Sequence, residues 1–514
     1  MDMSAARVRV LSCLRIGLML AAVLFGIRSS EAQVNSGYVA YGLSGSGAQH
    51  PVAGLLLASD GNYWGTTTLG GPNGHGTIFS MTPAGEITVA YSFNGTDGEQ
   101  PRSPLVENVD GTFFGTTSTG GAFSYGTAFR FNRFTGVLTL LHSFTGDATE
   151  YGFPNGIMQA SDGNFYGTTQ GAIFKITSPP TLTFSVLHTF NSTTEGYSPL
   201  NNVVEGSNGL LYGSISGLGG APNEDLARIY SIAKTGGSLQ ILYQASRSDG
   251  FASNTLIQGK DGALYGTARD GGAFWNTTGC FAAGNCGTVF RFDLTTNTYT
   301  VLFSFDGGSD GRNPEGGLLQ GTDGWLYGTT AVGTLGGGTI FRIGTSGGLT
   351  TIHQFGDGTS GYSPRGELIE SSAGVFYGTT YNGGSNDGGV VYRMTLCAAD
   401  VSALVSVASQ GPLKLNRKTG RYTQTVTLKN GDGAMGGPVS LVMDGLSSDA
   451  TLFNATGGTT CAAPLGSPYV NVDVGTDSVF NPRERATVTF EFATSSGQPP
   501  TYTGTRVLVG GGNR

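Results

Sequence analysis

A short motif that joins a turn to an aromatic strand recurs seven times and strongly limits what this chain can fold into. The copies are DGNYWGT at 60–66, DGTFFGT at 110–116, DGNFYGT at 162–168, NGLLYGS at 208–214, DGALYGT at 261–267, DGWLYGT at 323–329 and AGVFYGT at 373–379. Their glycines are 50, 52, 46, 53, 62 and 50 residues apart. A period near fifty residues indicates stacked supersecondary units rather than independent domains.

Each unit contains four strand-like runs. In the second unit they are LVEN at 105–108, FFGTTS at 113–118, TAFRF at 127–131 and VLTLLHSF at 137–144. The Asp-Gly between the first two runs is typical of a two-residue hairpin turn. The third run has an aromatic residue in every unit, preceded by an apolar residue or Ala, as expected of a strand covered on both faces. The pattern predicts an all-β fold, a seven-bladed β-propeller.

The two ends of the repeat region predict how the propeller closes. The seventh unit stops near Leu396 without a fourth strand, and residues 38–51 align with the fourth run and following loop of the first unit at 89–101. We therefore expect the N-terminal strand to complete the seventh blade. Such closure would remove the free sheet edges that invite aggregation.

The tandem units have the form DGxxYGTTxxGG…GTxFR…LxSFxGxxG, and this pattern resembles the bacterial extracellular repeat family called GloVer. The resemblance covers about residues 37–396. It implies an exported protein followed by an anchoring or sorting module, and it implies no particular activity. The fourth unit departs from the pattern, with SISGLGGAPNEDLARIY at 214–230.

The sequence on either side of the repeats predicts a signal peptide and a second domain. Residues 1–32 combine early arginines, an apolar run at 16–27 and a Ser-Glu-Ala cleavage site, so we expect a secreted or periplasmic protein. No transmembrane segment is expected once the signal is removed. We assign 33–396 to the propeller. Alternating runs such as YTQTVTLKN at 422–430 predict a β-sandwich at 397–514. It resembles the immunoglobulin-like modules of bacterial surface proteins and is expected to act as a spacer, with sugar or partner binding as the alternative.

Four cysteines remain after Cys13 leaves with the signal peptide, and an even number in an exported chain suggests disulfides. Cys280 and Cys286 flank a five-residue loop and are the expected partners, which leaves Cys397 to pair with Cys461. A zinc site is the alternative, but no histidine stands at ligand spacing. Because the loop is short, the first disulfide is expected to stiffen only its own surroundings.

Composition and charge exclude some functions. With 87 glycines but no G-x-y period, the chain is not collagen, and its net charge of −8 and pI near 5.2 argue against nucleic acid. His142, His188 and His353 occupy one repeat position that other units fill with Tyr or Phe, which favours packing. Acidic loop residues also recur unit by unit, which favours turns. We therefore assign no catalytic residue and no metal site.

Two other repeated features, the acidic loops and a repeated basic residue, have a functional interpretation beside the structural one. Calcium could bind at Asp306 and Asp310 or at Asn94 and Asp97, although two oxygens per loop are few for that ion, and no other cofactor is expected. A basic residue follows the third-run aromatic in five units, at Arg130, Lys175, Arg291, Arg342 and Arg393. These cations form either an anion cradle or salt bridges to the Asp-Gly turns.

The loops between the second and third strands and those leading to the next blade share one rim, which carries the candidate ligand-binding aromatics. These are Phe274, Trp275, Tyr125, Tyr197, Tyr362 and Tyr381. Phe274 and Trp275 lie on the longest insert, at 268–287. Aromatic faces beside polar side chains suit sugars or peptides. The chain is therefore expected to be a monomeric, non-enzymatic protein that binds a polysaccharide or protein ligand. The alternative is a polysaccharide lyase or glycoside hydrolase acting at the channel mouth.

Overall fold

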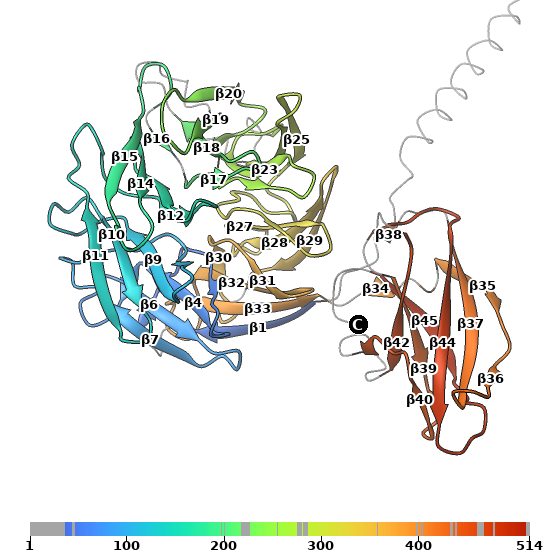
Figure 1. The fold of residues 1–514 in the computed structure, drawn as a ribbon. Helices are drawn as coiled ribbons and strands as arrows, with labels where there is room; N and C mark the ends of the chain where they lie inside the picture. Colours follow the sequence, from blue (N-terminus) through green and yellow to red (C-terminus); the bar gives the residue numbers. More distant parts are fainter. Residues whose placement is uncertain are drawn as a thin grey trace, which may run out of the picture. The chain divides into compact units, whose positions relative to one another are not determined.

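The computed structural model contains two compact units, Asn35–Cys397 and Ala398–Gly510 (Figure 1). It describes residues 36–43, 47–196, 198–199, 201–216, 227–253, 255–274, 280, 286–356, 358–396, 399–400, 402, 404–431, 435–436, 439–459, 467–475 and 479–509. The expected signal peptide and the residues Trp275, Tyr197, Cys397 and Cys461 lie outside these ranges.

The first unit is built from antiparallel sheets of four or five strands, one for each repeat of the motif (Figure 1). In the first three, the strands are β3 (Leu56–Leu57), β4 (Tyr63–Thr67), β6 (Thr77–Met81) and β7 (Ile87–Ser92); β8 (Val106–Glu107), β9 (Thr112–Thr117), β10 (Thr127–Asn132) and β11 (Val137–Ser143); and β12 (Gly156–Gln159), β13 (Phe165–Thr168), β14 (Ala172–Ile176) and β15 (Phe184–Thr189).

The fourth to sixth sheets follow the same order along the chain. Their strands are β16 (Ser198–Pro199), β17 (Val204–Glu205), β18 (Leu210–Ser216), β19 (Arg228–Ala233) and β20 (Gln240–Gln244); β21 (Phe251–Ser253), β22 (Ile257–Gln258), β23 (Leu264–Asp270), β24 (Thr288–Asp293) and β25 (Thr298–Ser304); and β26 (Leu319–Gln320), β27 (Leu326–Thr330), β28 (Thr339–Gly344) and β29 (Gly347–Gln354).

The last sheet joins the two ends of the unit. It contains β30 (Tyr362–Pro364), β31 (Ile369–Ser372), β32 (Val375–Asn382), β33 (Val390–Leu396) and β1 (Ser36–Gly42). Strand β1 pairs antiparallel with β33, from Ser36 opposite Leu396 to Gly42 opposite Val390. A small additional sheet pairs β2 (Ala48–Gln49) with β5 (Leu69–Gly70).

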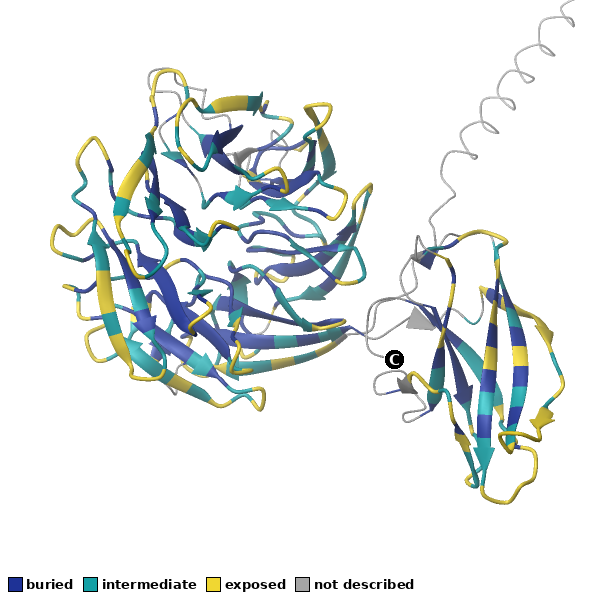
Figure 2. Ribbon diagram, in the orientation of Figure 1, coloured by how far each residue is buried: buried dark blue, intermediate teal, exposed yellow. Residues whose placement is uncertain are grey.

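The repeated Tyr-Gly-Thr motif has a packing role. Its glycine stands opposite the third-strand aromatic, as Gly115 does opposite Phe129, and a Cβ on Gly115 would lie 2.6 Å from the Phe129 ring. The space that each glycine leaves empty is therefore filled by an aromatic ring. Figure 2 shows the middle strands dark blue along most of their length, and Phe79, Phe129, Phe174 and Phe290 are fully buried.

The second unit contains two larger sheets and one small one. The strands are β34 (Ala399–Asp400), β45 (Gly504–Val509), β39 (Val439–Asp444), β42 (Pro468–Val472) and β41 (Gly457–Gly458); β35 (Val405–Gln410), β36 (Lys414–Asn416), β37 (Arg421–Asn430), β44 (Arg485–Thr494) and β40 (Ala450–Leu452); and β38 (Met435–Gly436) with β43 (Val479–Phe480). Burial alternates along β37 and β44. One hydrophobic core takes residues from both large sheets, including Val426, Phe490 and Leu441.

Every regular element among the described residues is a strand, which confirms the all-β prediction. Within the same residues there is no helix with the length and apolar character needed to span a bilayer.

Candidate functional site

A cavity of about 330 Å³ lies in the first unit and is lined by one short segment from each repeat. These segments are 52–54, 102–104, 155–158, 201–204, 255–257, 315–317 and 365–367. Each lies just before, or runs into, one of the strands β3, β8, β12, β17, β22, β26 and β31. All repeats therefore contribute to one open cavity, at the lower end of the size range of small-ligand pockets.

A backbone contact at the proline before each of five segments fixes where the segment starts. The residue before the proline has a positive φ of 53–58°, at His50, Gln100, Phe153, Asn313 and Ser363. Its N–H donates to a carbonyl of the preceding repeat: Gln100 to His75, Phe153 to Tyr125, Asn313 to Cys286, Ser363 to Gly337 and His50 to Gly388. These bonds offset the cost of a left-handed conformation in residues other than glycine.

The threonine of the Gly-Thr motif also fixes the cavity-lining segments, through a hydrogen bond from the preceding repeat. Its hydroxyl donates to a carbonyl of a cavity-lining segment in the next repeat: Thr66 to Ser103, Thr168 to Asn201, Thr267 to Gly316 and Thr379 to Ala53. The motif that defines the fold therefore also positions the cavity wall.

Charged side chains meet at the position directly after the proline. The Nε atom of Arg365 lies 3.2 Å from Oε2 of Glu315, as an ion pair without hydrogen-bond alignment. The Arg365 guanidinium also lies 4.4 Å from the centre of the Tyr381 ring. In the second repeat, Arg102 donates a hydrogen bond to Oε1 of Gln100. Tyr381 lies at the end of β32 that leads into the loop between the second and third strands of the last repeat. The charges of Arg365 and Glu315 therefore lie on the side of the cavity that faces these loops.

A carboxyl group, that of Glu367, occupies the third position after the repeated proline. At this third position the repeats carry Gly54, Pro104, Asn202, Thr255, Gly317 and Glu367, and the third repeat is one residue shorter. Burial raises the pKa of Glu367, and the nearby Thr255 hydroxyl offsets only part of that rise. A Cβ on Gly317 would lie 2.4 Å from Oε1 of Glu367, so the carboxyl group uses the space that the glycine leaves.

Of the predicted rim aromatics, Tyr381 borders the cavity through Arg365, and its ring centre also lies 4.7 Å from that of His50. Tyr125 and Phe274 are partly exposed but do not line the cavity. The ring of Tyr125 packs edge-on against Phe153. The hydroxyl of Tyr362 bonds Asp387, which raises the pKa of Tyr362. The structure therefore links one described member of the predicted set to the site.

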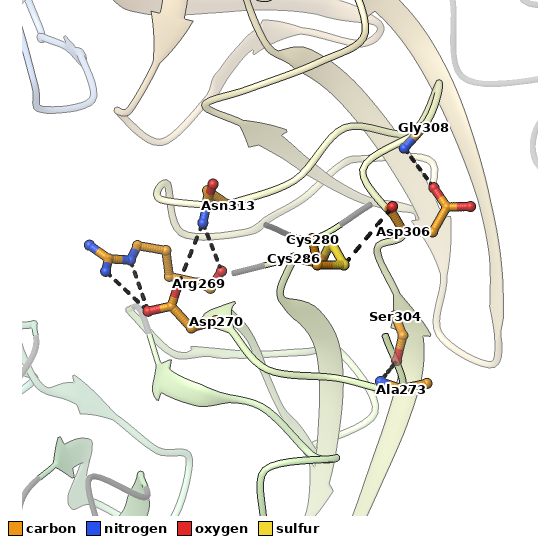
Figure 3. Close-up of a disulfide and its surroundings, with 9 residues drawn as sticks. All are labelled: Arg269, Asp270, Ala273, Cys280, Cys286, Ser304, Asp306, Gly308 and Asn313. Atoms are coloured by element: carbon orange, nitrogen blue, oxygen red, sulfur yellow. Dashed lines mark hydrogen bonds and ion pairs between the residues drawn. A yellow bond between two sulfur atoms is a disulfide. The ribbon is translucent and has the colours of Figure 1, made fainter. Parts of the chain in front are cut away.

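Cys280 and Cys286 form a disulfide, with Cα atoms 5.2 Å apart (Figure 3). Both cysteines are fully buried in a hydrophobic cluster that includes Phe305 and Phe341, from the fifth and sixth repeats. The Cys286 carbonyl accepts the N–H of Asn313 at the start of the sixth cavity segment. Because both cysteines pack in this cluster, we expect the disulfide to stabilise more than its own loop.

The histidines of the shared repeat position pack against aromatic rings, and two of them pair with a glutamate. The ring centre of His142 lies 3.6 Å from that of Phe184, and its Nε2 lies 2.9 Å from Oε2 of Glu150. His188 makes the same contact with Glu195 at 2.9 Å. In other units a tyrosine stands in place of the histidine and pairs with a carboxylate, as Tyr243 donates a hydrogen bond to Asp249. None of these described residues lines the cavity.

The repeated cations and the calcium candidates are also engaged locally. Arg130 pairs with Asp110 and Arg291 with Asp261, whereas Lys175 and Arg342 lie over the rings of Tyr166 and Trp325. Burial and the neighbouring carboxylate of Asp306, which can accept the proton of Asp310, raise the pKa of Asp310 to about 7. Within the described part of the chain, no three His, Cys, Asp or Glu side chains are grouped to hold a metal.

Glu315, Arg365 and Glu367 were missed by the sequence analysis. Their signal is visible when the repeats are aligned on the proline, in PEGG at 314–317 and PRGE at 364–367. Charged residues there replace the small, apolar or amide residues of most other repeats.

A family model described as the Gloeobacter/Verrucomicrobia repeat matches residues 17–225 and 219–453. Among solved structures, a catalytically inactive virginiamycin B lyase from Staphylococcus aureus with quinupristin is 15% identical, with 71% of this chain and 100% of that chain covered and a TM-score of 0.50. A streptogramin B lyase is 16% identical over 72% and 100%, with a TM-score of 0.49. A Xanthomonas campestris gluconolactonase is 16% identical over 56% and 82%, with a TM-score of 0.33.

At these identities the likeness concerns the fold alone, which is β-propeller-like. No curated protein matches the chain.

Proposed function

This chain belongs to the Gloeobacter/Verrucomicrobia repeat family, and from that premise we propose that it is an exported, non-enzymatic binding protein built on a closed seven-bladed β-propeller. Family membership brings the tandem repeat and no shared activity, so the function has to be argued from the site. The ligand binds at the loop-side mouth of the cavity.

Contacts between the first and last repeats support closure. The pairing of β1 with β33 covers an edge that would otherwise be open. The bonds from His50 to Gly388 and from Thr379 to Ala53 repeat the contacts found between consecutive repeats elsewhere. The last junction therefore repeats both of these contacts, as a closed ring requires.

The second unit is proposed to be an immunoglobulin-like β-sandwich that acts as a spacer. Its two large sheets share one core, which supports this fold. A surface role needs such a module to hold the ligand-binding unit away from its attachment. The fold by itself gives the module no binding activity.

One observation carries the binding proposal: the cavity brings together charged residues from different repeats where most repeats are uncharged. A position that serves only packing has the same kind of residue in each repeat, as the Gly-Thr motif shows. The ion pair of Glu315 with Arg365 instead occurs at a single junction, beside the face of Tyr381. Aromatic faces beside charged, hydrogen-bonding groups are suited to a carbohydrate or a protein side chain.

The test is a glycan and peptide array with the full chain, followed by titration of the strongest hit. Tyr381→Ala and Arg365→Ala should each weaken binding at least about tenfold, as for residues at the centre of a binding site. Tyr125→Ala is the matched control, because this exposed ring packs against Phe153, whereas the Tyr381 ring packs against Arg365 of the cavity wall. Equal binding by all four proteins would contradict the proposed location.

A second candidate is a polysaccharide lyase or glycoside hydrolase at the same mouth. It is favoured by the presence of two glutamates and an arginine in one cavity, where Glu367 has a raised pKa, as a general acid requires. Release of reducing ends, or absorbance from unsaturated products, would support this candidate. Loss of that activity in Glu315→Gln or Glu367→Gln would assign it to the cavity.

A further inference from the structure

We infer that Glu367, Thr255 and Asn202 form a hydrogen-bonding surface inside the cavity that selects an uncharged, hydroxyl-bearing group, such as the terminal ring of a neutral glycan. This inference rests on the proposed function and adds the ligand class. The three residues come from the seventh, fifth and fourth repeats and line one cavity.

The residues around Glu367 leave space for its side chain. Glycines stand at the same position in the neighbouring sixth and first repeats. A Cβ on Gly317 would lie 2.4 Å from Oε1 of Glu367, and a Cβ on Gly54 would lie 2.9 Å from its backbone oxygen. Any larger residue at Gly317 would displace the carboxyl group. Thr255, from the fifth repeat, lines the same cavity, and its hydroxyl partly offsets the raised pKa of Glu367.

The third position lies further from the loops than the post-proline position, because it leads into the first strand of each sheet. The charges at the post-proline position are partly compensated, since Arg365 pairs with Glu315. The uncompensated cation of the wall is Arg102 on the loop side, with Gln100 as its polar contact among the described residues. A ligand group that enters from the loop side therefore meets the charged residues before it reaches Glu367.

The hydrogen-bonding capacity of these groups favours hydroxyls. Burial favours the neutral form of the Glu367 carboxyl group, which both donates and accepts, as the Asn202 amide and the Thr255 hydroxyl also do. A sugar hydroxyl likewise donates and accepts, so it matches all three. A ligand carboxylate offers only acceptors and would face Glu367 without a nearby cation. A ligand ammonium offers only donors and would have to pass Arg102 and Arg365.

The experiment compares three probe classes on the full chain: neutral, glucuronate-terminated and glucosamine-terminated oligosaccharides. We expect the neutral probes to bind most tightly. Glu367→Ala should weaken that binding at least about tenfold, and Glu367→Gln, which keeps a donor and an acceptor, should stay within about threefold of the wild type. Thermal melting of each variant checks that it is folded.

Gly317→Ala gives an independent test that leaves Glu367 in the sequence. The new methyl group meets the movable end of the Glu367 side chain, so the fold should persist while binding of neutral probes falls about as far as in Glu367→Ala. Gly504→Ala is the matched control, because a Cβ there meets nothing within 4 Å. If Glu367→Ala does not fold, Gly317→Ala and Thr255→Val carry the test.

The outcomes separate this inference from the proposed function. Preference for glucuronate or glucosamine probes, lost in Tyr381→Ala, would overturn the inference and leave the proposed function standing. So would neutral-probe binding that Tyr381→Ala removes and Glu367→Ala leaves intact. Absence of binding to every probe would overturn the inference.

Discussion

The ring of Phe341 occupies the space in front of Gly328 on the neighbouring strand: a Cβ on Gly328 would lie 2.5 Å from Cζ of Phe341. Both residues are in the sixth repeat, and the same pairing recurs in the others, as between Gly65 and Phe79. The glycine is therefore required by an aromatic ring and not by a turn.

Gly328→Ala should destabilise the first unit by about 1–3 kcal/mol, because the methyl group overpacks a buried ring. Chemical denaturation followed by tryptophan fluorescence measures the loss. Gly42→Ala, in the same unit, should stay close to the wild type, since its Cβ would meet open space. If both variants unfold alike, the pairing does not constrain the core.

Deletion of residues 36–42 tests the closure of the ring. The deletion removes the strand that pairs with β33, together with Tyr38, whose ring stacks on His353 at a centroid distance of 4.3 Å. We expect a loss of at least about 3 kcal/mol or of the cooperative transition, as for removal of large packed side chains. An unchanged calorimetric transition of the first unit would contradict closure by this strand.

Much of the fold could be predicted from the sequence because its determinants are local and repeated. The turn, the glycine and the third-strand aromatic fall within one fifty-residue unit and appear again in the next. The cavity was harder to predict, because Thr255 and Glu367 are 112 positions apart in the sequence and meet only when the sheets are arranged around one space.

For the rim aromatics, the sequence indicated exposed rings but not the contacts that those rings make. A loop tyrosine suggests an exposed ring, but sequence gives no sign of its neighbours. Tyr125 packs against Phe153, and the Tyr362 hydroxyl is used by Asp387. The charged replacements after the repeated proline carried the better signal, because they differ from a column that is otherwise uncharged in most repeats.

Stability should depend on pH through Asp310, whose pKa is raised to about 7 by burial and by the hydrogen bond with Asp306. A group whose pKa is higher in the folded state stabilises most below its unfolded pKa, and that contribution is lost as pH rises through the folded pKa. The contribution of Asp310 should therefore be full near pH 4 and lost above about pH 7.

Asp310→Asn keeps a hydrogen-bond donor but cannot ionise. The difference in melting temperature between wild type and this variant should therefore fall as pH rises from about 4 to 8. Asp449→Asn, in the second unit, is a control whose pKa is lowered instead, by hydrogen bonds from Ser496 and Ser447. A constant difference between wild type and Asp310→Asn would show that Asp310 does not titrate in this range.

Replacement of both Cys280 and Cys286 by alanine should cost about 2 kcal/mol or more of stability. Chain entropy accounts for about 2 kcal/mol in a loop this short. Loss of buried contacts with Phe305 and Phe341 adds to it. Denaturation of the double variant measures the effect, and a loss well below 1 kcal/mol would return the disulfide to a purely local role.

Adjacent repeats are also tied together at the Asp-Gly turns, by a glutamate or glutamine at the end of the first strand. Such residues accept the backbone N–H of the preceding repeat's turn: Glu107 from Ser59, Glu205 from Ser161, Gln258 from Ser207, Gln320 from Lys260 and Glu370 from Thr322. The first repeat has Leu57 at this position, so the junction between the last and first repeats lacks this carboxyl or amide acceptor.

Glu107→Ala should be the most costly of these changes, because Glu107 also pairs with the nearly buried Arg133. Removing the carboxylate leaves that guanidinium without its main partner, and breaking a buried pair costs about 3–5 kcal/mol. Gln258→Ala is the matched comparison, since it removes the same bond to a turn N–H with no cation involved, and should cost about 1 kcal/mol. Urea denaturation of both variants gives the two values. Equal losses would mean that Arg133 finds other partners and that the ion pair adds nothing to the junction.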